Sequence, residues 1–365
     1  MRLSTFCILA VLLLGGCGIN LPFGATTTPH TGIVVQPPGE YEPDADCVNL
    51  VSVVKAQNSR SKALAERYKD LQVIDIHTHG VADDPLPVIQ RQDQYNIDRA
   101  VVFGGAPASP AVDTDRVVFQ FYSRSPGRIY PFFAGIPLND TNGISLTAAS
   151  LEKGFLGISV GVSAGGAASL PGNTQDLTRG ILPDIYRLSA RYHAPILLHV
   201  DQPSGLLLPQ LEQVLDANPD TLIILGYANP TSTPQSISAL VKKHTNLFIS
   251  FTAYNPGGAY KTADYVSIIE RYSDQFMLSS DLANEADMGK ASQSIYELLD
   301  LLTPQTACKV SHQNIASIIE SQPATASQVA QIRDLSLQAG EDGARKLNRR
   351  TANELIVTLE NTLQK

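Results

Sequence analysis

From residue 72 onward, short apolar segments rich in Val, Ile and Phe alternate with longer amphipathic segments, and this alternation constrains the fold more than any other feature of the chain. Strict alternation of strands and helices predicts a parallel sheet covered by helices. Eight repeats within about 230 residues predict an α/β fold of the (β/α)8 TIM-like barrel type rather than an open sheet. The eight predicted strands are Val73–His79, Arg99–Gly104, Ile129–Ile136, Phe155–Val160, Pro195–Val200, Leu222–Tyr227, Leu247–Thr252 and Phe276–Asp281. The predicted helices between them include Ile181–Arg191, Leu206–Ala217, Pro234–Lys243, Thr262–Tyr272 and Gln293–Leu302.

The segments that flank the barrel are predicted to be helical. Cys47–Leu71 carries a helical apolar stripe, so we expect the barrel domain to begin with this helix and to span residues 47–321. Residues 322–365 form a polar C-terminal extension that we expect to pack beneath the barrel or against a partner. The apolar residues available for that packing are Leu335, Leu337, Leu347, Leu355, Val357 and Leu359.

The N-terminus has the pattern of an export signal. A positive start, Met1-Arg2, precedes the apolar run Phe6–Gly16, which at about 16 Å is too short to span a bilayer. We therefore expect a signal peptide over residues 1–16. Its end, Leu14-Gly15-Gly16-Cys17, resembles the bacterial lipobox, which implies a lipid on Cys17; a chance Cys after an ordinary signal is the alternative.

The lipoprotein resemblance implies a place in the bacterial cell envelope. Gly18, rather than Asp, follows Cys17, which in Gram-negative lipoproteins implies the outer membrane, facing the periplasm. Residues 17–46 are rich in turn and extended signals, so we expect a flexible tether between lipid and barrel. The partner implied here is the membrane, reached through the N-terminal anchor.

The charge of the chain limits the class of partner, and its cysteines indicate whether a disulfide can form. The 27 basic and 35 acidic residues give a net charge of −8, which argues against nucleic acid as a partner. Of the four cysteines, Cys7 lies in the signal and Cys17 is the lipid site, which leaves Cys47 and Cys308. In an oxidising compartment these two are candidates for a disulfide, with two unpaired buried thiols as the alternative.

The first predicted strand ends in a metal-binding pattern. His77 and His79 are two residues apart in Asp75-Ile76-His77-Thr78-His79, so both imidazoles point to the same side of the strand. At the carboxyl end of a barrel strand that side is the mouth, where active sites of this fold lie. Two imidazoles there can hold one divalent cation.

The strand-one motif, Asp75-Ile76-His77-Thr78-His79-Gly80, resembles that of the amidohydrolase superfamily. The resemblance is closest to the branch of metal-dependent hydrolases and enzymes of the aminocarboxymuconate-semialdehyde decarboxylase type. It continues in order over residues 72–320, with strand-like segments ending in His199 and in Ser279-Ser280-Asp281. It also includes the closing segment Gln313-Asn314-Ile315-Ala316.

The resemblance implies a mononuclear metal site with His77, His79, His199 and Asp281 as ligands. Three imidazoles and one carboxylate suit Zn²⁺, which lowers the pKa of a water molecule that it binds. Asp281 would also move a proton from that water to the leaving group. The alternatives are a hydrogen-bonded buried histidine at His199 and a helix cap at Asp281.

The sequence departs from the family at two positions. The histidine that usually ends the sixth strand aligns with Tyr227, whose phenol is a poor base at neutral pH but can donate a hydrogen bond to an oxyanion. Ser159 stands near the place of the carboxylated lysine of binuclear members, so we expect a single metal ion. A mononuclear enzyme with altered proton handling and a domain that has lost its chemistry are both compatible with these changes.

The predicted mouth loops carry few cations, which favours a neutral small-molecule substrate. Tyr254 and Lys261 follow the seventh strand and are our candidates for substrate binding. We expect a metal-dependent hydrolase that cleaves an amide, ester or lactone bond. The alternatives are a metal-dependent decarboxylase of a small acid, for which Lys261 would bind the carboxylate, and a non-catalytic envelope binding protein. Homo-oligomerisation stays open.

Overall fold

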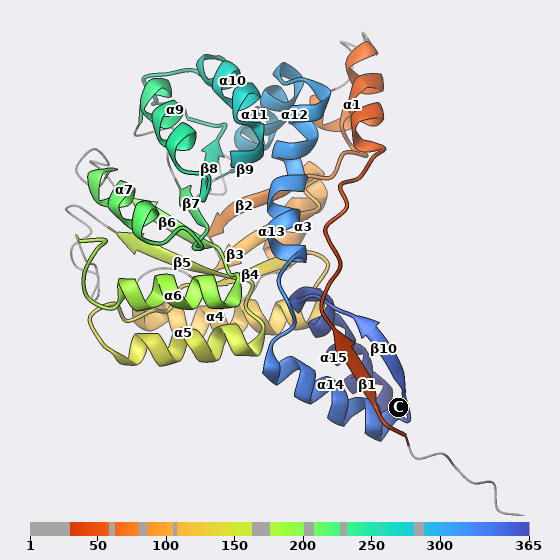
Figure 1. Ribbon diagram of the computed structural model, residues 1–365. Helices are drawn as coiled ribbons and strands as arrows, with labels where there is room; N and C mark the ends of the chain where they lie inside the picture. Colours follow the sequence, from red (N-terminus) through yellow and green to blue (C-terminus); the bar gives the residue numbers. More distant parts are fainter. Residues whose placement is uncertain are drawn as a thin grey trace, which may run out of the picture.

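The computed structural model describes residues 30–57, 63–79, 86–104, 108–162, 176–200, 208–226, 232–255, 257–280 and 288–364. Eight parallel strands follow one another in sequence order around a nearly closed barrel, which confirms the predicted (β/α)8 architecture (Figure 1). The strands are β2 (Ile74–His79), β3 (Arg99–Phe103), β4 (Ile129–Phe133), β5 (Gly157–Val162), β6 (Ile196–Val200), β7 (Ile223–Gly226), β8 (Leu247–Thr252) and β9 (Phe276–Ser279).

Helices follow the strands and cover the outside of the barrel (Figure 1). Those between strands are α3 (Leu86–Tyr95), α4 (Ala108–Arg124), α5 (Asn142–Lys153), α6 (Leu182–Tyr192), α7 (Leu208–Ala217), α9 (Pro234–Lys243), α10 (Thr262–Arg271) and the 3₁₀ turn η2 (Ser273–Gln275). After β9 come α11 (Met288–Leu301), α12 (Pro304–Cys308), the π-helical turn η4 (Lys309–Gln313) and α13 (Asn314–Glu320).

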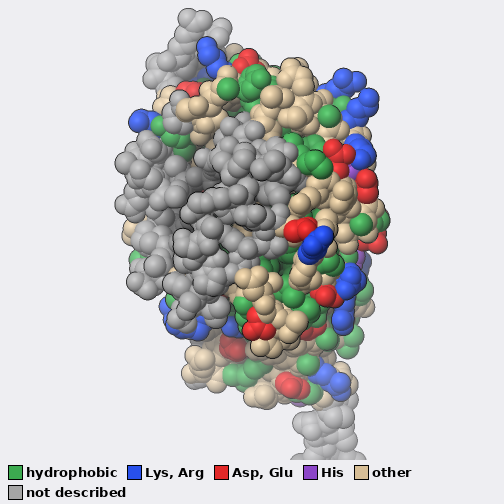
Figure 2. Space-filling model, turned by 90° about the vertical axis from the view of Figure 1, so that its left-hand side faces the viewer, with side chains coloured by type: hydrophobic (Ala, Val, Ile, Leu, Met, Phe, Trp, Pro, Cys, Tyr) green, Lys and Arg blue, Asp and Glu red, His purple; other side chains and the backbone are tan. Residues whose placement is uncertain are grey.

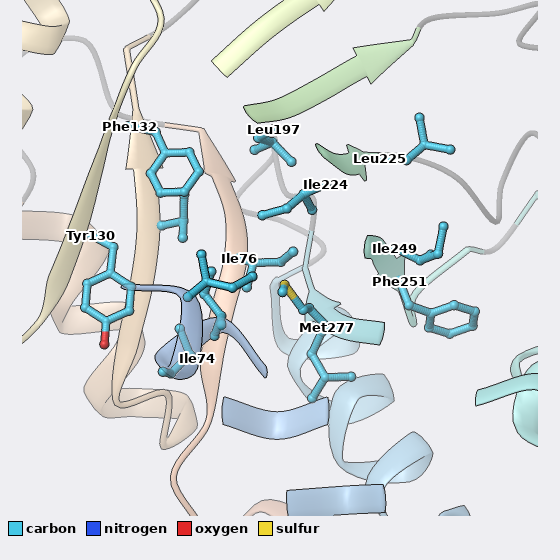
Figure 3. Close-up of a cluster of buried hydrophobic side chains, with 14 of the residues drawn as sticks. Ile74, Ile76, Tyr130, Phe132, Leu197, Ile224, Leu225, Ile249, Phe251 and Met277 are labelled. Atoms are coloured by element: carbon cyan, nitrogen blue, oxygen red, sulfur yellow. The ribbon is translucent and has the colours of Figure 1, made fainter. Parts of the chain in front are cut away.

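The strands are buried on both faces, as expected for a parallel sheet between a filled barrel interior and a layer of helices. All five residues of β4 and all four of β7 and of β9 are buried. Figure 3 shows part of this core, where Ile76, Phe132, Leu197, Ile224 and Met277 come from five different strands. This packed interior leaves the two ends of the barrel as the places where polar groups can gather.

The N-terminal and C-terminal segments form a second, smaller unit. The strand β1 (Ile33–Gln36) pairs in parallel with β10 (Gly343–Lys346), beside α14 (Ala326–Ala339) and α15 (Arg349–Leu363). Ile33 packs there with buried residues of the extension such as Ile332 and Leu355. The flexible tether expected over residues 17–46 therefore extends too far along the chain, because β1 lies within that range and its apolar side joins this core.

The predicted extension is helical but contains β10, which the sequence analysis did not predict. Of its expected apolar contacts, Leu347, Leu355 and Leu359 are buried, whereas Leu337 is 39% exposed. The unit packs on the barrel through α5 and through Arg349, which donates hydrogen bonds to the carbonyl groups of Phe155 and Tyr192. Both carbonyls precede strands, so the extension lies at the end of the barrel away from the strands' carboxyl ends.

The segment before the barrel folds as α1 (Cys47–Ala56) and the short α2 (Leu64–Arg67) rather than as one helix over Cys47–Leu71. A disulfide joins Cys47, at the start of α1, to Cys308, at the end of α12, with the two Cα atoms 6.1 Å apart. Within the described ranges, no helix is both long and apolar enough to span a membrane.

Candidate active site

Two of the predicted metal ligands meet inside the barrel at the carboxyl ends of the strands. His77 comes from β2 and His199 from β6, and the centroids of their imidazole rings are 4.0 Å apart with the planes at 71°. His77 is fully buried and His199 is half-buried. Because β2 and β6 lie four strands apart in the barrel, the two rings approach each other across its interior.

Glycines occupy the positions beside His199 on both neighbouring strands. His199 is in register with Gly161 on β5 and with Gly226 on β7. A Cβ atom placed on Gly226 would lie 3.4 Å from both imidazole rings, an ordinary contact, so a side chain larger than that of alanine would press on the rings. The register also puts Gly161, rather than Ser159, level with His199, and a glycine supplies no side-chain ligand from β5.

An aromatic ring forms an apolar wall beside the two histidines. Phe103 ends β3 and is 4% exposed, with its ring centroid 5.5 Å from that of His77 and 5.8 Å from that of His199. A buried apolar ring lowers the local dielectric, which strengthens electrostatic interactions with a bound ion or a reacting group. No motif in the sequence assigns Phe103 a role.

A buried carboxylate, Asp75, lies at the base of this site. It accepts hydrogen bonds from the backbone N–H of His77 (3.1 Å), the hydroxyl of Thr78 (3.1 Å), and both the N–H (2.9 Å) and the hydroxyl of Ser280. Burial raises the pKa of the Asp75 carboxyl group, and these hydrogen bonds oppose the rise. The sequence signal for it was present: an acidic residue inside an otherwise apolar strand, two positions before the first histidine.

A second buried carboxylate, Asp115 on α4, holds the chain where β3 and β4 end. It accepts hydrogen bonds from the N–H groups of Gly104 (2.7 Å), Ala134 (2.9 Å) and Gly135 (2.7 Å). Burial raises the pKa of Asp115 to about 6 despite these three donors. Asp115 therefore organises the mouth on the side of the barrel that carries none of the predicted ligands.

Several predicted site residues lie outside the described residues. They are Cys17, Tyr227, Asp281 and the side chain of His79, whose backbone belongs to β2. Within the described residues, no group of three or more His, Cys, Asp and Glu side chains is placed to hold a metal ion. The structure thus brings together two of the four predicted ligands, His77 and His199.

The two substrate-binding candidates occupy different surroundings. Tyr254 follows β8 and is half-buried, whereas Lys261 is exposed at the start of α10, where its N–H donates to the carboxylate of Asp264. Figure 2 looks at the molecule from the side toward which the strands point. Around the margin of this view the described side chains mix acidic, basic and apolar groups, without a patch of one sign of charge.

The remaining described histidines have other surroundings. His30 pairs with Asp342 at 2.5 Å in the small unit, and His193 ends α6 in a left-handed conformation. His244 is buried with its Nδ1 3.5 Å from a carboxylate oxygen of Asp216. His312 lies in η4, and burial lowers its pKa to about 4. None of these four residues is on a barrel strand.

The donor set at His77 and His199 fits a divalent metal ion. Two imidazoles that bind one tetrahedral Zn²⁺ need nitrogens roughly 3.3 Å apart, from bond lengths of about 2.0 Å. The ring centroids of such a pair lie roughly 5 Å apart, so the two rings, now at 4.0 Å, would move apart by about 1 Å to bind the ion together. His79 follows on the same strand, and Asp281 directly follows Ser280, which Asp75 holds beside β2.

Comparison with known proteins establishes the fold. No family model and no curated protein sequence matches the chain. Among solved structures, it is similar to an uncharacterized TIM-barrel protein, Bb4693, from Bordetella bronchiseptica, with a TM-score of 0.54 and 14% identity over 69% of this chain and 99% of that one. It is also similar to 2,6-dihydroxybenzoate decarboxylase in complex with 2,6-dihydroxybenzoate, with a TM-score of 0.52 and 16% identity over 68% and 99% of the two chains. The enzyme of that name from Rhizobium gives a TM-score of 0.50 at 16% identity, with the same coverage.

Proposed function

We propose that this protein is a metal-dependent hydrolase that cleaves an amide, ester or lactone bond in a small molecule. The observation that carries the proposal is the meeting of the His77 and His199 imidazoles at the carboxyl ends of β2 and β6. This is the end of a (β/α)8 barrel at which catalytic groups lie. The metal that suits the four proposed ligands, His77, His79, His199 and Asp281, is Zn²⁺.

A bound divalent ion would supply two effects, polarisation of the scissile carbonyl and a lowered pKa for water. The residues of the chain supply the rest. The carboxylate of Asp281 would accept a proton from the attacking water and pass it to the leaving group. The phenol of Tyr227 would donate a hydrogen bond to the oxygen on which negative charge develops. Phe103 would exclude bulk water from one side of the site.

A second candidate activity is decarboxylation of a small aromatic acid. The observation that favours it is the structural similarity to 2,6-dihydroxybenzoate decarboxylase over 99% of that chain. The same ligands would then orient a carboxylate substrate, with Phe103 against its ring and Lys261 as the cation for its charge. The third possibility is an envelope protein that binds metal but catalyses no reaction. It is suggested by Tyr227, which stands where the family usually has a histidine.

One set of measurements distinguishes these readings. Metal content is determined on the full chain and on the His77→Ala and His199→Ala variants, with His244→Asn as a control in which a buried histidine remote from the site is changed. The protein is then tested with esters, lactones and amides and, separately, for CO2 release from 2,6-dihydroxybenzoate. We expect bound metal in the parent and in the His244→Asn control but not in the two alanine variants. We also expect hydrolysis only in the proteins that bind metal. Absence of metal from the parent would exclude both enzymatic readings.

Two further outcomes separate the remaining readings. Metal-dependent CO2 release without hydrolysis would replace the hydrolase by the decarboxylase. Bound metal without either reaction favours the binding protein, and Tyr227→His then tests the cause. Hydrolysis gained by that variant would show that the tyrosine keeps the parent inactive.

We also propose that the protein is lipid-anchored in the bacterial envelope through Cys17. The support is the signal pattern of residues 1–16 and the lipobox-like Leu14-Gly15-Gly16-Cys17. Mass spectrometry of the N-terminal peptide from membranes of the native host tests it. We expect an acylated peptide that begins at Cys17 and its loss in Cys17→Ser; an unmodified peptide would contradict the proposal.

A further inference from the structure

The barrel has a seam between its first and last strands. Backbone ladders join each strand from β2 to β9 to the next, and within the described residues no ladder joins β9 back to β2. At the mouth, Asp75 links the two sides of this seam. Its carboxylate, on β2, accepts both the backbone N–H and the side-chain hydroxyl of Ser280, the residue that follows β9.

Asp75 also fixes the backbone on its own strand. The register between β2 and β3 shifts between Asp75 and Thr78, so the regular ladder is interrupted there. The N–H of His77 instead donates to the Asp75 carboxylate at 3.1 Å, and the hydroxyl of Thr78 donates to its other oxygen at 3.1 Å. Such a local bulge redirects side chains, and His77 lies within it.

We propose that Asp75 is a positioning residue for the metal site, because one carboxylate holds the strand segments that carry its ligands on both sides of the seam. On β2 it holds the backbone of His77 itself. On the β9 side it holds Ser280, which directly precedes Asp281. This inference rests on the proposed function, since it assigns Asp75 a role toward the same metal ion.

The surroundings of Asp75 also suit a neighbouring cation. The carboxylate is 6% exposed, and among the described residues it forms no ion pair with a lysine or arginine. A divalent cation held by His77 would place positive charge close to this buried carboxyl group. Carboxylates that support metal ligands in this way raise the affinity for the metal, and their removal typically weakens it about 10- to 100-fold.

The chain offers a matched control. Asp115 is also a buried carboxylate that accepts backbone N–H groups at the mouth, but it holds the ends of β3 and β4, which carry no proposed ligand. If Asp75 only stabilises the fold, Asp75→Asn and Asp115→Asn should behave alike. If it positions the ligands, only Asp75→Asn should change metal binding.

The experiment measures Zn²⁺ dissociation constants of the full-length wild type, Asp75→Asn and Asp115→Asn by competition with a chromophoric chelator. The visible spectrum of each Co²⁺-loaded protein reports ligand geometry, and urea unfolding of the metal-free proteins reports stability. We expect Asp75→Asn to bind Zn²⁺ about 10- to 100-fold more weakly, with an altered Co²⁺ spectrum. Asp115→Asn should lose stability while keeping the wild-type affinity and spectrum.

The outcomes separate this inference from the proposed function. A wild type that binds neither Zn²⁺ nor Co²⁺ overturns the proposed function itself. A wild type that binds metal, together with an Asp75→Asn variant of equal affinity and spectrum, overturns only the role of Asp75. Should Asp75→Asn not fold, Ser280→Ala removes one donor and keeps the Ser280 N–H. We expect it to weaken Zn²⁺ binding by a smaller factor, and unchanged binding would overturn the inference.

Discussion

At the scale of the residue, the two glycines beside His199 differ in what surrounds them. A Cβ atom on Gly226 would touch both the His77 and the His199 ring at 3.4 Å, whereas one on Gly161 meets no described atom within 4 Å. The branched side chain of valine would push further toward the rings at position 226. Position 226 thus limits the size of the side chain beside the rings, and no ligand motif contains this position.

We expect Gly226→Val to weaken Zn²⁺ binding about tenfold or more, because overpacking by methyl groups costs about 1–3 kcal/mol. Gly161→Val, at the matching position on the other neighbouring strand, should change the affinity much less. Chelator competition measures both. Equal affinities for the two variants would mean that the spacing of the rings does not depend on Gly226.

The carboxyl group of Asp115 should make stability depend on pH. Its pKa is about 6 in the fold and lies near 4 in the unfolded chain, so the folded protein binds more protons between these values. The free energy of unfolding should therefore decrease as the pH rises from about 4 to 6, by about 3 kcal/mol from this group. Urea unfolding at several pH values should show this decrease in the wild type and its loss in Asp115→Asn; equal slopes would contradict the assignment.

At the scale of the element, two neighbouring helices end in a left-handed residue, one in a glycine and one in a histidine. Gly154 follows α5 with φ of 114°, and His193 follows α6 with φ of 49°. This conformation costs a residue with a Cβ atom about 1–2 kcal/mol, which glycine avoids. The end of α6 therefore carries strain that the end of α5 does not.

His193→Gly should raise the free energy of unfolding by up to about 1 kcal/mol, since relief of strain exceeds the added entropy of the unfolded chain. Gly154→Ala should lower it, because the new Cβ atom would also lie 2.8 Å from the amide nitrogen of Gln328. Urea unfolding tests both changes. A His193→Gly protein that is less stable, or that loses Zn²⁺ binding, would show a role for this imidazole beyond the helix end.

Helices and strands whose ends are marked by nearby residues, such as a helix cap, could be predicted from the sequence. The helix α9 begins and ends as expected because Thr233 caps it and Pro234 opens it, and β8 also has its expected bounds. The strand β5 begins two residues later than expected, at Gly157, where a Cβ atom would collide with the ring of Phe132. Such a contact between strands leaves no mark in the local pattern.

In the candidate site, too, some features could be predicted from the sequence and others could not. The pairing of His77 with His199 could be expected from the register of strand ends and from the family resemblance. The bonds of Asp75 to Ser280 could not, because they join the first strand of the barrel to the residue that follows the last strand, 205 positions later. For the same reason β1 was missed, since its partner begins at Gly343, near the other end of the chain.

At the scale of the whole molecule, the disulfide ties the segment before the barrel to the helices after it. Cys47 and Cys308 are 3% and 0% exposed, and they close a loop of 261 residues that contains the whole barrel. A cross-link over so long a loop restricts the unfolded chain strongly, and removing a native disulfide typically costs about 2–5 kcal/mol.

We expect the double variant Cys47→Ala/Cys308→Ala to lower the free energy of unfolding by about 2–5 kcal/mol, with Zn²⁺ affinity unchanged because the bond is far from the strands' carboxyl ends. Urea unfolding under oxidising conditions measures the loss, and wild type with reductant should approach the variant. A double variant as stable as oxidised wild type would show that the bond adds nothing to stability.

The parallel pairing of β1 with β10 determines where the described N-terminal segment joins the molecule. His30 enters the small unit beside Asp342, and that unit packs on the barrel at the end where strands begin. His30, where the described part of the chain begins, therefore lies at the end of the barrel opposite the strands' carboxyl ends. The barrel end that carries His77 and His199 faces away from the small unit, so changes within the described residues of that unit remove no direct neighbour of the two imidazoles.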